Sequence, residues 1–403
     1  MVLIQKLELF EIIKKIYSII RRLILSFTLI LAKKLKITNF KHLTTDGRVK
    51  LDCNSPFNIL KKKDIHLLIK HFMVEELSKK EIKQLRRSAK KFLYNKNITK
   101  EDKIEILFQW YDKLDLTGQK SIPLYDTDAR LMKVKDKGQK YKKWAYNIQV
   151  AMDTDSKLIC GINTVQYPTD HYQIPELIDQ TIENIEVTPE IISADQIYGT
   201  LGNLFYLKEH NISARIPTGK QSREAMGKII ENPYHLDYFK YNEEKDVIIC
   251  PENQELIRQS ERDGKVQKGG FYKREIKYYN KEACQNCPHK SECTESKYRI
   301  VTRQVHELSL EVEKIMDTTR GQNDYKKRMS TAEPINGIFI KIYNYESYQI
   351  TGLDRTQDLM FRIASAYNTI RIFNIARDNG WDLNKLLVFV HLVGLRQDEL
   401  LVS

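Results

Sequence analysis

Cysteine, proline, glycine and tryptophan are all scarce in this sequence. Its 403 residues include 6 cysteines, 10 prolines, 16 glycines and 3 tryptophans. Six cysteines are too few for the disulfide framework of a secreted protein, which favours reduced thiols or a metal site in the cytosol. The composition also excludes a collagen-like chain, a disordered chain and a coiled coil as overall descriptions. The 41% hydrophobic fraction fits a folded protein of two or three domains.

The sequence lacks a hydrophobic run long enough to cross a membrane. The longest uncharged stretch, 23–32, is about half the length of a bilayer-spanning helix. Basic residues between positions 14 and 22 interrupt the apolar positions before it, which argues against a signal peptide. Residues 1–40 have apolar residues at helical spacing and are predicted to form one or two amphipathic helices. We therefore expect no membrane partner and a cytoplasmic location.

Acidic residues are outnumbered by basic ones. The chain has 66 Lys and Arg against 53 Asp and Glu, so its formal net charge is 66 − 53 = +13. A basic balance favours phosphate-rich partners because each neutralised phosphate releases condensed counterions. Nucleic acid is the first candidate partner and an anionic membrane surface the second.

The periodicity of the chain changes after Asp128. The segment 61–116 is helical and heavily charged, whereas 144–153 alternates and is followed by 158–165 across a short polar turn, as in a β-hairpin. The next segments are predicted to be a helix at 171–185, a strand at 190–195, a helix at 201–209 and a strand at 213–217. A hairpin followed by alternating helices and strands predicts a mixed α/β sheet.

The rest of the chain, from residue 220, divides into two parts. Residues 220–299 are rich in Lys, Glu, Asn and Tyr, contain four cysteines, and are predicted to be an inserted module. Helical patterns follow at 306–316 and 358–377. The second of these has five large apolar residues predicted to share one face: Leu359, Ile363, Tyr367, Ile370 and Phe373.

Three acidic residues are candidates for chemistry. Asp195 follows an apolar strand, at the rim where α/β sheets bind ligands, although such a residue also caps a following helix. Asp46 lies in an alternating segment, where Asp-Gly equally suits a hairpin turn. Glu333 follows a basic cluster at 326–328, and a helix-surface salt bridge would explain it as well.

Six segments in order resemble prokaryotic insertion-sequence transposases of the DDE type, in the IS-four-like superfamily. They are 45–50 (TDGRVK), 126–133 (DTDARLMK), 146–153 (YNIQVAMD), 170–171 (DH), 193–199 (SADQIYG) and 328–334 (RMSTAEP). The resemblance covers about residues 40 to 375. It implies an RNase H-like α/β core, a mixed sheet with flanking helices, in a prokaryotic protein that acts near the nucleoid.

The resemblance implies a catalytic triad of Asp46 on the first strand, Asp195 on the fourth strand and Glu333 on a helix. Asp126 and Asp128 compete with Asp46, which is preferred because its Asp-Gly-x-x-[IV]-Lys setting looks like the first-strand motif. The expected regions are a helical N-terminal region at 1–40, the first part of the core at 41–219 with a helical insertion at 61–118, a Cys-rich insertion at 220–300, and a C-terminal part at 301–403 that completes the core.

Three clustered carboxylates require cations, and hard oxygen ligands select Mg²⁺ or Mn²⁺. Two such ions would serve an in-line displacement at phosphorus. The resemblance implies that water first cuts the transposon end and that the freed 3′-hydroxyl then attacks target DNA. The expected partners are transposon-end and target DNA and a second copy of the chain in a homodimer.

The family also has a Tyr, Arg, Glu, Lys signature around its last acid. It is matched by Tyr325, Arg328 and Glu333 and, with a longer spacing, by Lys341. The signature implies that Tyr325, Arg328 and Lys341 contact DNA, with the basic side chains binding phosphates without reading sequence.

Four cysteines form a candidate structural zinc site: Cys250, Cys284, Cys287 and Cys293. Four thiolates suit tetrahedral Zn²⁺, and His289 is a substitute ligand. Reduced unpaired thiols are the alternative. The remaining two cysteines, Cys53 and Cys160, are predicted to be buried apolar residues.

The segment before the first catalytic strand is shorter than in the resembling family. Two alternatives to an active transposase therefore remain open: a remnant that binds DNA without catalysis, and a metal-dependent nuclease that cuts DNA without joining it.

Overall fold

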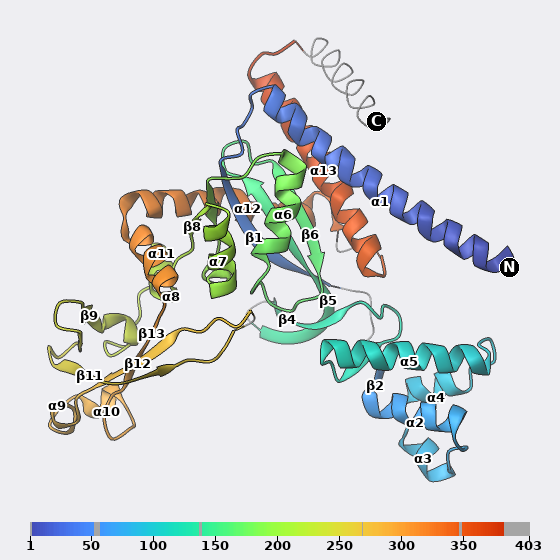
Figure 1. The fold of residues 1–403 in the computed structure, drawn as a ribbon, viewed down its shortest axis with the longest axis horizontal. Coiled ribbons are helices and arrows are strands. Elements are labelled where there is room, and N and C mark those ends of the chain that lie inside the picture. Colours follow the sequence, from blue (N-terminus) through green and yellow to red (C-terminus); the bar gives the residue numbers. More distant parts are fainter. Residues whose placement is uncertain (1, 52–56, 137–138, 268, 346–348, 383–403) are drawn as a thin grey trace.

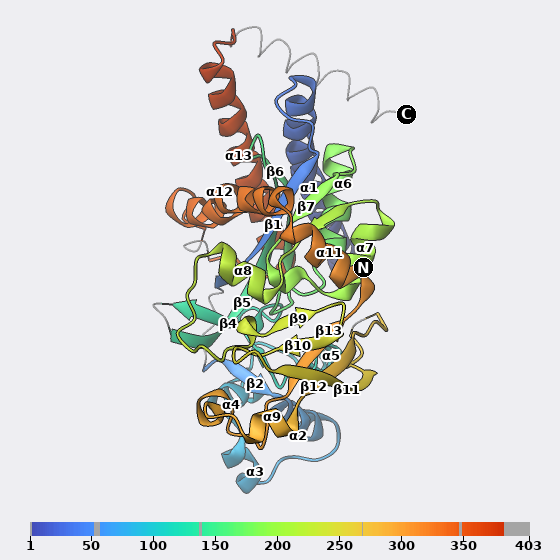
Figure 2. The ribbon, with the colours of Figure 1, turned by 90° about the vertical axis from the view of Figure 1, so that its left-hand side faces the viewer.

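The computed structural model describes residues 2–51, 57–136, 139–267, 269–345 and 349–382. Figure 1 shows a central α/β core from which two lobes extend on the same side. One lobe contains the helices α2 to α5, and the other contains the strands β9 to β13. Figure 2, turned by 90°, shows that the long helices α1 and α13 rise from the opposite end of the core.

The core sheet has six strands. They are β1 (His42–Leu51), β4 (Arg130–Asp136), β5 (Gln139–Asp153), β6 (Ile159–Val165), β7 (Ile191–Ser193) and β8 (Ser213–Arg215). The central path is β4-β5-β1-β7-β8, and β6 also pairs with β5. The pairings β1·β5 and β5·β6 are antiparallel, whereas β1·β7 and β7·β8 are parallel. This mixed α/β sheet is consistent with an RNase H-like fold.

Side-chain amides satisfy the free edge of β6. Asn368 accepts a hydrogen bond from the Ile159 N–H at 2.9 Å and donates one to its carbonyl at 2.9 Å. Gln357 accepts from the Thr164 N–H and donates to the Ile162 carbonyl at 2.7 Å. Both amides come from α13, so this helix does at the edge what a neighbouring strand would do.

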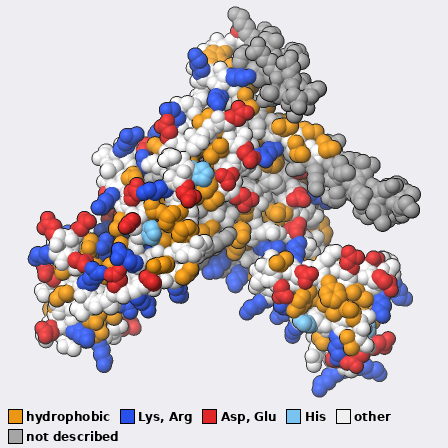
Figure 3. All heavy atoms as spheres, in the orientation of Figure 1, with side chains coloured by type: hydrophobic (Ala, Val, Ile, Leu, Met, Phe, Trp, Pro, Cys, Tyr) orange, Lys and Arg blue, Asp and Glu red, His pale blue; other side chains and the backbone are white. Residues whose placement is uncertain are grey.

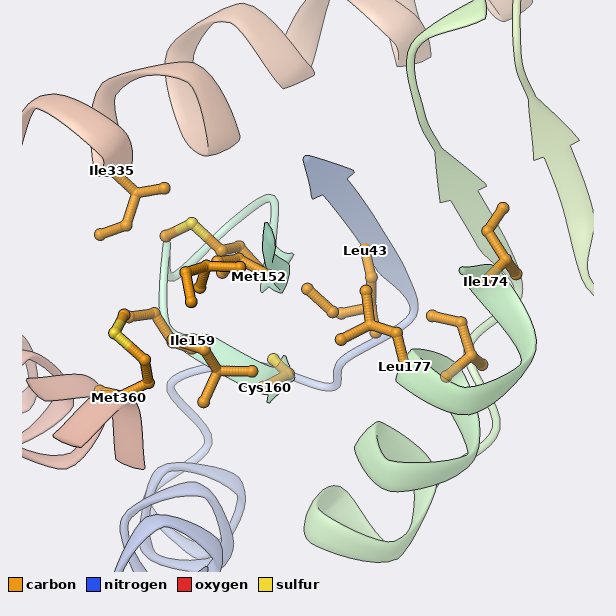
Figure 4. Packing of buried hydrophobic residues seen from close by; sticks show 14 of the residues in the cluster. Leu43, Met152, Ile159, Cys160, Ile174, Leu177, Ile335 and Met360 are labelled. Atoms are coloured by element: carbon orange, nitrogen blue, oxygen red, sulfur yellow. The ribbon is translucent and has the colours of Figure 1, made fainter. Parts of the chain in front are cut away.

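Helices cover both faces of the sheet. The core helices are α6 (Ile174–Ile185), α7 (Leu201–Glu209), α8 (Gly219–Ala225), α11 (Glu307–Asp317), α12 (Thr319–Lys341) and α13 (Leu353–Asp378). Figure 4 shows Ile174 and Leu177 of α6 on one side of the strand residues, and Ile335 of α12 and Met360 of α13 on the other. The apolar residues of α6 recur at helical spacing, so one face of that helix is buried.

The helical lobe is inserted into the core between β1 and β4. It contains α2 (Lys62–Met73), α3 (Lys79–Gln84), α4 (Arg87–Leu93) and α5 (Lys100–Thr117), closed by the short strands β2 (Ile59–Lys61) and β3 (Ser121–Pro123). These helices bury an apolar cluster of their own that includes Ile65, Leu68 and Leu107. The lobe therefore has a separate small core, and the charged residues noted in the sequence lie around it.

The other lobe is built on a five-stranded antiparallel sheet. Its strands are β9 (Lys240–Asn242), β10 (Val247–Ile249), β11 (Glu255–Asp263), β12 (Arg274–Tyr279) and β13 (Val301–Val305), with the short helices α9 (Lys281–Gln285) and α10 (Lys290–Cys293) beside them. Because β13 pairs with β12, the sheet continues past residue 300, where the sequence predicted the insertion to end. The sequence also missed the sheet itself, because β9 and β10 have only three residues each and β11 is mostly exposed.

The helix α1 (Val2–Lys34) packs beside α13. The sequence predicted Ile370 and Phe373 on the buried face of α13, but they are 54% and 46% exposed. The buried face of its second half runs instead through Asn368, Ile372 and Ala376. The helix α13 turns this face toward the sheet because Asn368 must reach the edge of β6. No helix in the described part of the chain is both long and apolar enough to span a bilayer.

Candidate active site

The three predicted acids come from three separate elements and meet at one place. Asp46 lies inside the continuous strand β1, so the Asp-Gly hairpin turn is wrong. Asp195 follows β7 and caps the 3-10 turn Gln196–Tyr198 through the Gln196 N–H, while its role in chemistry stays a prediction. Glu333 lies on α12. The parallel pairing of β7 with β1 aligns Ser193 with Thr44, which brings Asp195 to the level of Asp46.

Arg328 contacts all three carboxylates. Its Nη2 is 3.9 Å from Asp46 Oδ1 and 3.8 Å from Asp195 Oδ2, and its Nη1 donates to Glu333 Oε1 at 3.2 Å. The side chain of Arg328 is only 5% exposed. A buried guanidinium is stable only when it is paired, so these acids hold it in place and it holds them together.

Asp46 has a raised pKa in this cluster. Burial, together with the nearby carboxylates Asp170 and Asp195, raises its pKa to about 6 against the opposing effects of Arg328 and the Gly47 N–H. The carboxyl group is 19% exposed, so water screens its charge poorly. A carboxylate whose pKa is raised in this way binds a proton or another cation more readily than an exposed carboxylate does.

Two contacts fix α12 against the sheet. Near its start, Asp324 accepts a hydrogen bond at 3.2 Å from the buried Arg215 guanidinium of β8, and Asp324 itself is partly buried. Farther along, Asn336 donates its amide Nδ2 to Asp46 Oδ2 at 3.1 Å. Pro334 lies between these anchors and removes one helical hydrogen bond immediately after Glu333. Sequence reasoning missed Asn336, although it lies three residues after Glu333 on the same side of the helix.

A second polar cluster, which also contains a carboxylate, lies behind Asp46. Asp170 Oδ1 accepts hydrogen bonds from the side chains of Asn147 and Gln149, both at 2.7 Å. Gln149 in turn accepts a hydrogen bond at 2.6 Å from the buried Tyr198 hydroxyl. A Cβ atom added at Gly47 would overlap the carboxylate of Asp170, so glycine is required there. Alternating polar residues at 147 and 149 in an otherwise apolar strand were the sequence signal for this cluster.

The rival acids Asp126 and Asp128 have other partners. Asp126 Oδ2 accepts hydrogen bonds from the Tyr146 hydroxyl at 2.7 Å and from the Gly352 N–H at 2.8 Å. Asp128 pairs with Lys113 and accepts a hydrogen bond from the Leu353 N–H at 3.2 Å. Both acids therefore hold the start of α13 beside the hairpin.

The other signature residues differ in position. Tyr325 is 5% exposed, with its ring centroid 5.8 Å from the Arg328 guanidinium carbon, so it packs within the cluster. Lys341 is the last residue of α12 and is exposed. It lies about 12 Å along the helix axis from Glu333 at about 1.5 Å per residue. The structure thus brings Tyr325 and Arg328, but not Lys341, to the three acids.

The four clustered cysteines line one pocket in the β9–β13 lobe. Cys250, Cys284, Cys287 and Cys293 all contribute to its wall. The Gln254 N–H donates to the Cys250 sulfur at 3.4 Å. Burial raises the pKa of the Cys293 thiol, and the other three sulfurs add to this effect. All four thiols are free of disulfides.

The sequence also predicts His289 as a substitute zinc ligand and two cysteines outside the cluster. His289 stacks on Tyr234 with 5.7 Å between ring centroids, and its Nδ1 is 3.3 Å from Glu292. Cys160 is fully buried in the core, as predicted, and Cys53 lies outside the described residues. Among the residues that the structure describes, no three His, Cys, Asp or Glu side chains are grouped closely enough to hold a metal ion.

Comparison with known proteins gives one family. Residues 249–373 match a family model described as a transposase DDE domain. This range contains Glu333, Arg328 and the four cysteines, while the strands that carry Asp46 and Asp195 precede it in the chain and join it in the fold. Among curated proteins, none matches this chain. In this part of the chain, which packs helices against a mixed α/β sheet, the protein is therefore similar to the transposase DDE domain.

Proposed function

We propose that this protein is a DDE transposase that binds DNA, cuts it at transposon ends in a metal-dependent reaction, and joins the freed 3′-hydroxyl to target DNA. The observation that carries the proposal is the meeting of Asp46, Asp195 and Glu333, from two strands and a helix, around one buried guanidinium. Residues so far apart in the sequence come together only through the fold. Their shared negative charge is the feature that metal-dependent phosphoryl transfer requires.

The donor set suits the proposed ions. Three carboxylates are hard oxygen ligands of the kind that Mg²⁺ and Mn²⁺ prefer. The pKa of Asp46 is raised first by burial and then by the nearby carboxylates, and a bound cation would stabilise its ionised form. When bound, divalent ions supply an activated oxygen and charge stabilisation at phosphorus. Arg328 now neutralises this charge, so its guanidinium must yield the carboxylate oxygens to the ions.

The protein's own residues have distinct proposed roles. Asp46, Asp195 and Glu333 are the metal ligands, and Asn336 orients Asp46 by binding its second oxygen. Arg328, released from the acids, is placed to bind a DNA phosphate, as is Lys341 from the end of the helix. Tyr325 supports Arg328 through its ring. The preference for Asp46 over Asp126 and Asp128 follows from their partners described above.

A second candidate function has an observation in its favour. A guanidinium already occupies the centre of the acidic cluster, and the described acids are not grouped as a metal site. A remnant that binds DNA without cutting it would have such a cluster as a purely structural ion-pair network. A nuclease that cuts without joining would use the same residues as the transposase, so only the reaction products separate these two.

The test is incubation of the purified full chain with DNA that carries the ends of its element, together with Mg²⁺ or Mn²⁺. We expect nicked ends followed by joined products, and neither product when EDTA is present. Cleavage without joining would show the nuclease. DNA retention on a filter with no cleavage in either metal would show the remnant and overturn the proposed activity.

We also propose a structural Zn²⁺ in the β9–β13 lobe, held by Cys250, Cys284, Cys287 and Cys293. Four sulfurs are a suitable donor set, and the amide hydrogen bond to Cys250 would stabilise its thiolate. His289 already contacts Tyr234 and Glu292, which makes it the less suitable ligand.

Zinc binding predicts about one Zn²⁺ per chain by elemental analysis, and loss of this zinc in Cys287→Ser. The variant should also become sensitive to protease within the lobe, because zinc binding and folding are coupled in such sites. Cys160→Ala is the matched control, since it removes a cysteine from the core and should keep the zinc. A metal-free wild type with a protease-resistant lobe would establish reduced thiols instead.

Three further expectations remain proposals. We propose that the protein acts as a homodimer across paired ends and works in the prokaryotic cytoplasm near the nucleoid. Membership of the IS-four-like superfamily also remains a prediction. Sedimentation with and without end DNA would test the dimer, because a single-copy complex would contradict it.

A further inference from the structure

The hairpin of β4 and β5 projects beyond the rest of the core sheet. Residues 145–153 of β5 pair with β1, but the pairing ends at Ala145, and residues 139–145 pair with β4 instead. In Figure 1 this hairpin lies at the edge of the core between the two lobes, and Figure 2 shows it reaching outward from the sheet. The hairpin is therefore a two-stranded arm that is joined to the core sheet only at its base.

Lysines face each other across this arm. Lys133 is paired directly with Lys142, and Lys143 follows on the opposite face with its Nζ 5.1 Å from the Tyr141 ring centroid. All three lysines are exposed. Like charges directly opposite in an antiparallel pair destabilise the pair. An arrangement that costs stability in the free protein points to a partner of opposite charge.

Among the side chains that the structure describes, these lysines also have no acidic partner. None of the described acidic side chains forms an ion pair with Lys133, Lys142 or Lys143, whereas exposed lysines elsewhere pair with acids. Figure 3 shows Lys and Arg side chains gathered where the core faces the gap between the two lobes. The arm thus presents unneutralised positive charge in the hollow of the molecule.

We propose that this arm binds the backbone phosphates of duplex DNA, beyond the acidic cluster and on the same substrate. The inference rests on the proposed function, because it places the DNA between the lobes. Asp46 pairs with Val150, and Lys142 lies eight residues before Val150 on β5. At about 3.3 Å per residue this is about 26 Å, which corresponds to about eight base pairs of duplex. The even spacing puts Lys142 on the sheet face of Asp46.

The experiment compares the wild type with a triple variant, Lys133→Gln, Lys142→Gln and Lys143→Gln, on a 30-base-pair duplex in EDTA. Each lost phosphate contact lowers the slope of log affinity against log salt by about 0.9, so three lower it by about 2.7. At 0.1 M salt the affinity should fall by more than about 100-fold and approach the wild-type value near 1 M salt.

The matched control removes three lysines that already have acidic partners: Lys41→Gln, Lys208→Gln and Lys245→Gln. It changes the net charge equally but should alter the salt slope by less than about one. Circular dichroism of both variants checks that they fold.

The outcomes separate this inference from the proposed catalysis. A lowered slope in the hairpin variant supports the arm even if the wild type never cuts DNA, because binding is measured without metal. An unchanged slope overturns the arm even if the wild type cuts and joins DNA. If the triple variant keeps its DNA binding but loses binding to vesicles that contain anionic lipid, the proposal is also overturned, in favour of a membrane surface.

Discussion

Replacing Asp195 by asparagine is expected to reduce the rate of DNA cleavage by at least about 10³-fold, or about 4 kcal/mol of transition-state stabilisation. The amide keeps the shape of the side chain but removes one of the three charges that would hold the metal ions. Glu333→Gln should lose activity to a similar extent. Single-turnover cleavage of end DNA in Mg²⁺ measures both losses.

Asp128→Asn is the matched control for this prediction. Asp128 competes with Asp46 in the sequence, but its contacts are Lys113 and the start of α13. We expect its cleavage rate to stay within several-fold of the wild type, while Asp46→Asn loses activity as Asp195→Asn does. The reverse result, with Asp128 essential and Asp46 dispensable, would show that the first acid has been assigned to the wrong strand.

Asp46→Asn is also expected to stabilise the metal-free fold by about 3 kcal/mol at pH 7. The pKa of Asp46 is raised from 3.8 to about 6, a difference of 2.2 units. At about 1.36 kcal/mol per unit, this is the free energy by which folding disfavours the ionised carboxyl. Asparagine has no charge to bury and can still accept the hydrogen bond from Asn336.

The sign of this effect with pH follows from proton binding. Between about pH 4 and 6 the folded state holds a proton on Asp46 that the unfolded state has released. The contribution of this group to stability therefore falls as pH rises through that window. The groups that act on it are the Arg328 guanidinium and the carboxylates of Asp170 and Asp195. The gain from Asp46→Asn should be close to zero near pH 3.5 and complete above about pH 7.

Denaturant unfolding in EDTA at several pH values measures this effect. Asp112→Asn, on the exposed side of α5, is the control and should change the free energy of unfolding by less than about 0.5 kcal/mol. Equal stabilities of wild type and Asp46→Asn at pH 7 would mean that Arg328 fully compensates the charge. A higher free energy of unfolding for Asp46→Asn than for the wild type would confirm that the ionised Asp46 carboxylate destabilises the fold. Functional sites commonly retain such groups at the cost of stability.

Local pattern was sufficient for the elements around the site. The alternation of 144–153, the apolar run of 158–165 and the helical spacing of 201–209 correspond to β5, β6 and α7. These patterns report which side of an element is apolar, and that depends on near neighbours in the sequence. The position of Asp195 at the end of a buried strand was visible for the same reason.

Long-range partners were not visible in the pattern. The burial of Arg328 among three acids depends on where α12 crosses β1, and the sequence indicated only the expected contact of this arginine with DNA. The exposure of Ile370 and Phe373 follows from the need of Asn368 to bind β6. The sheet of the cysteine lobe was missed because β9 and β10 are short and β11 is exposed along nearly its whole length.

The sequence by itself determined the order of the chemical groups: an acid in an early strand, an acid after a later strand, an acid near the end, and a basic surplus. Only the tertiary structure decided which acids meet. Asp46 and Asp126 were equivalent as isolated carboxylates, and their partners distinguish them, with Arg328 and Asn336 for one and Tyr146 and Gly352 for the other. Those partners lie far away in the sequence, so periodicity and spacing carry no information about them.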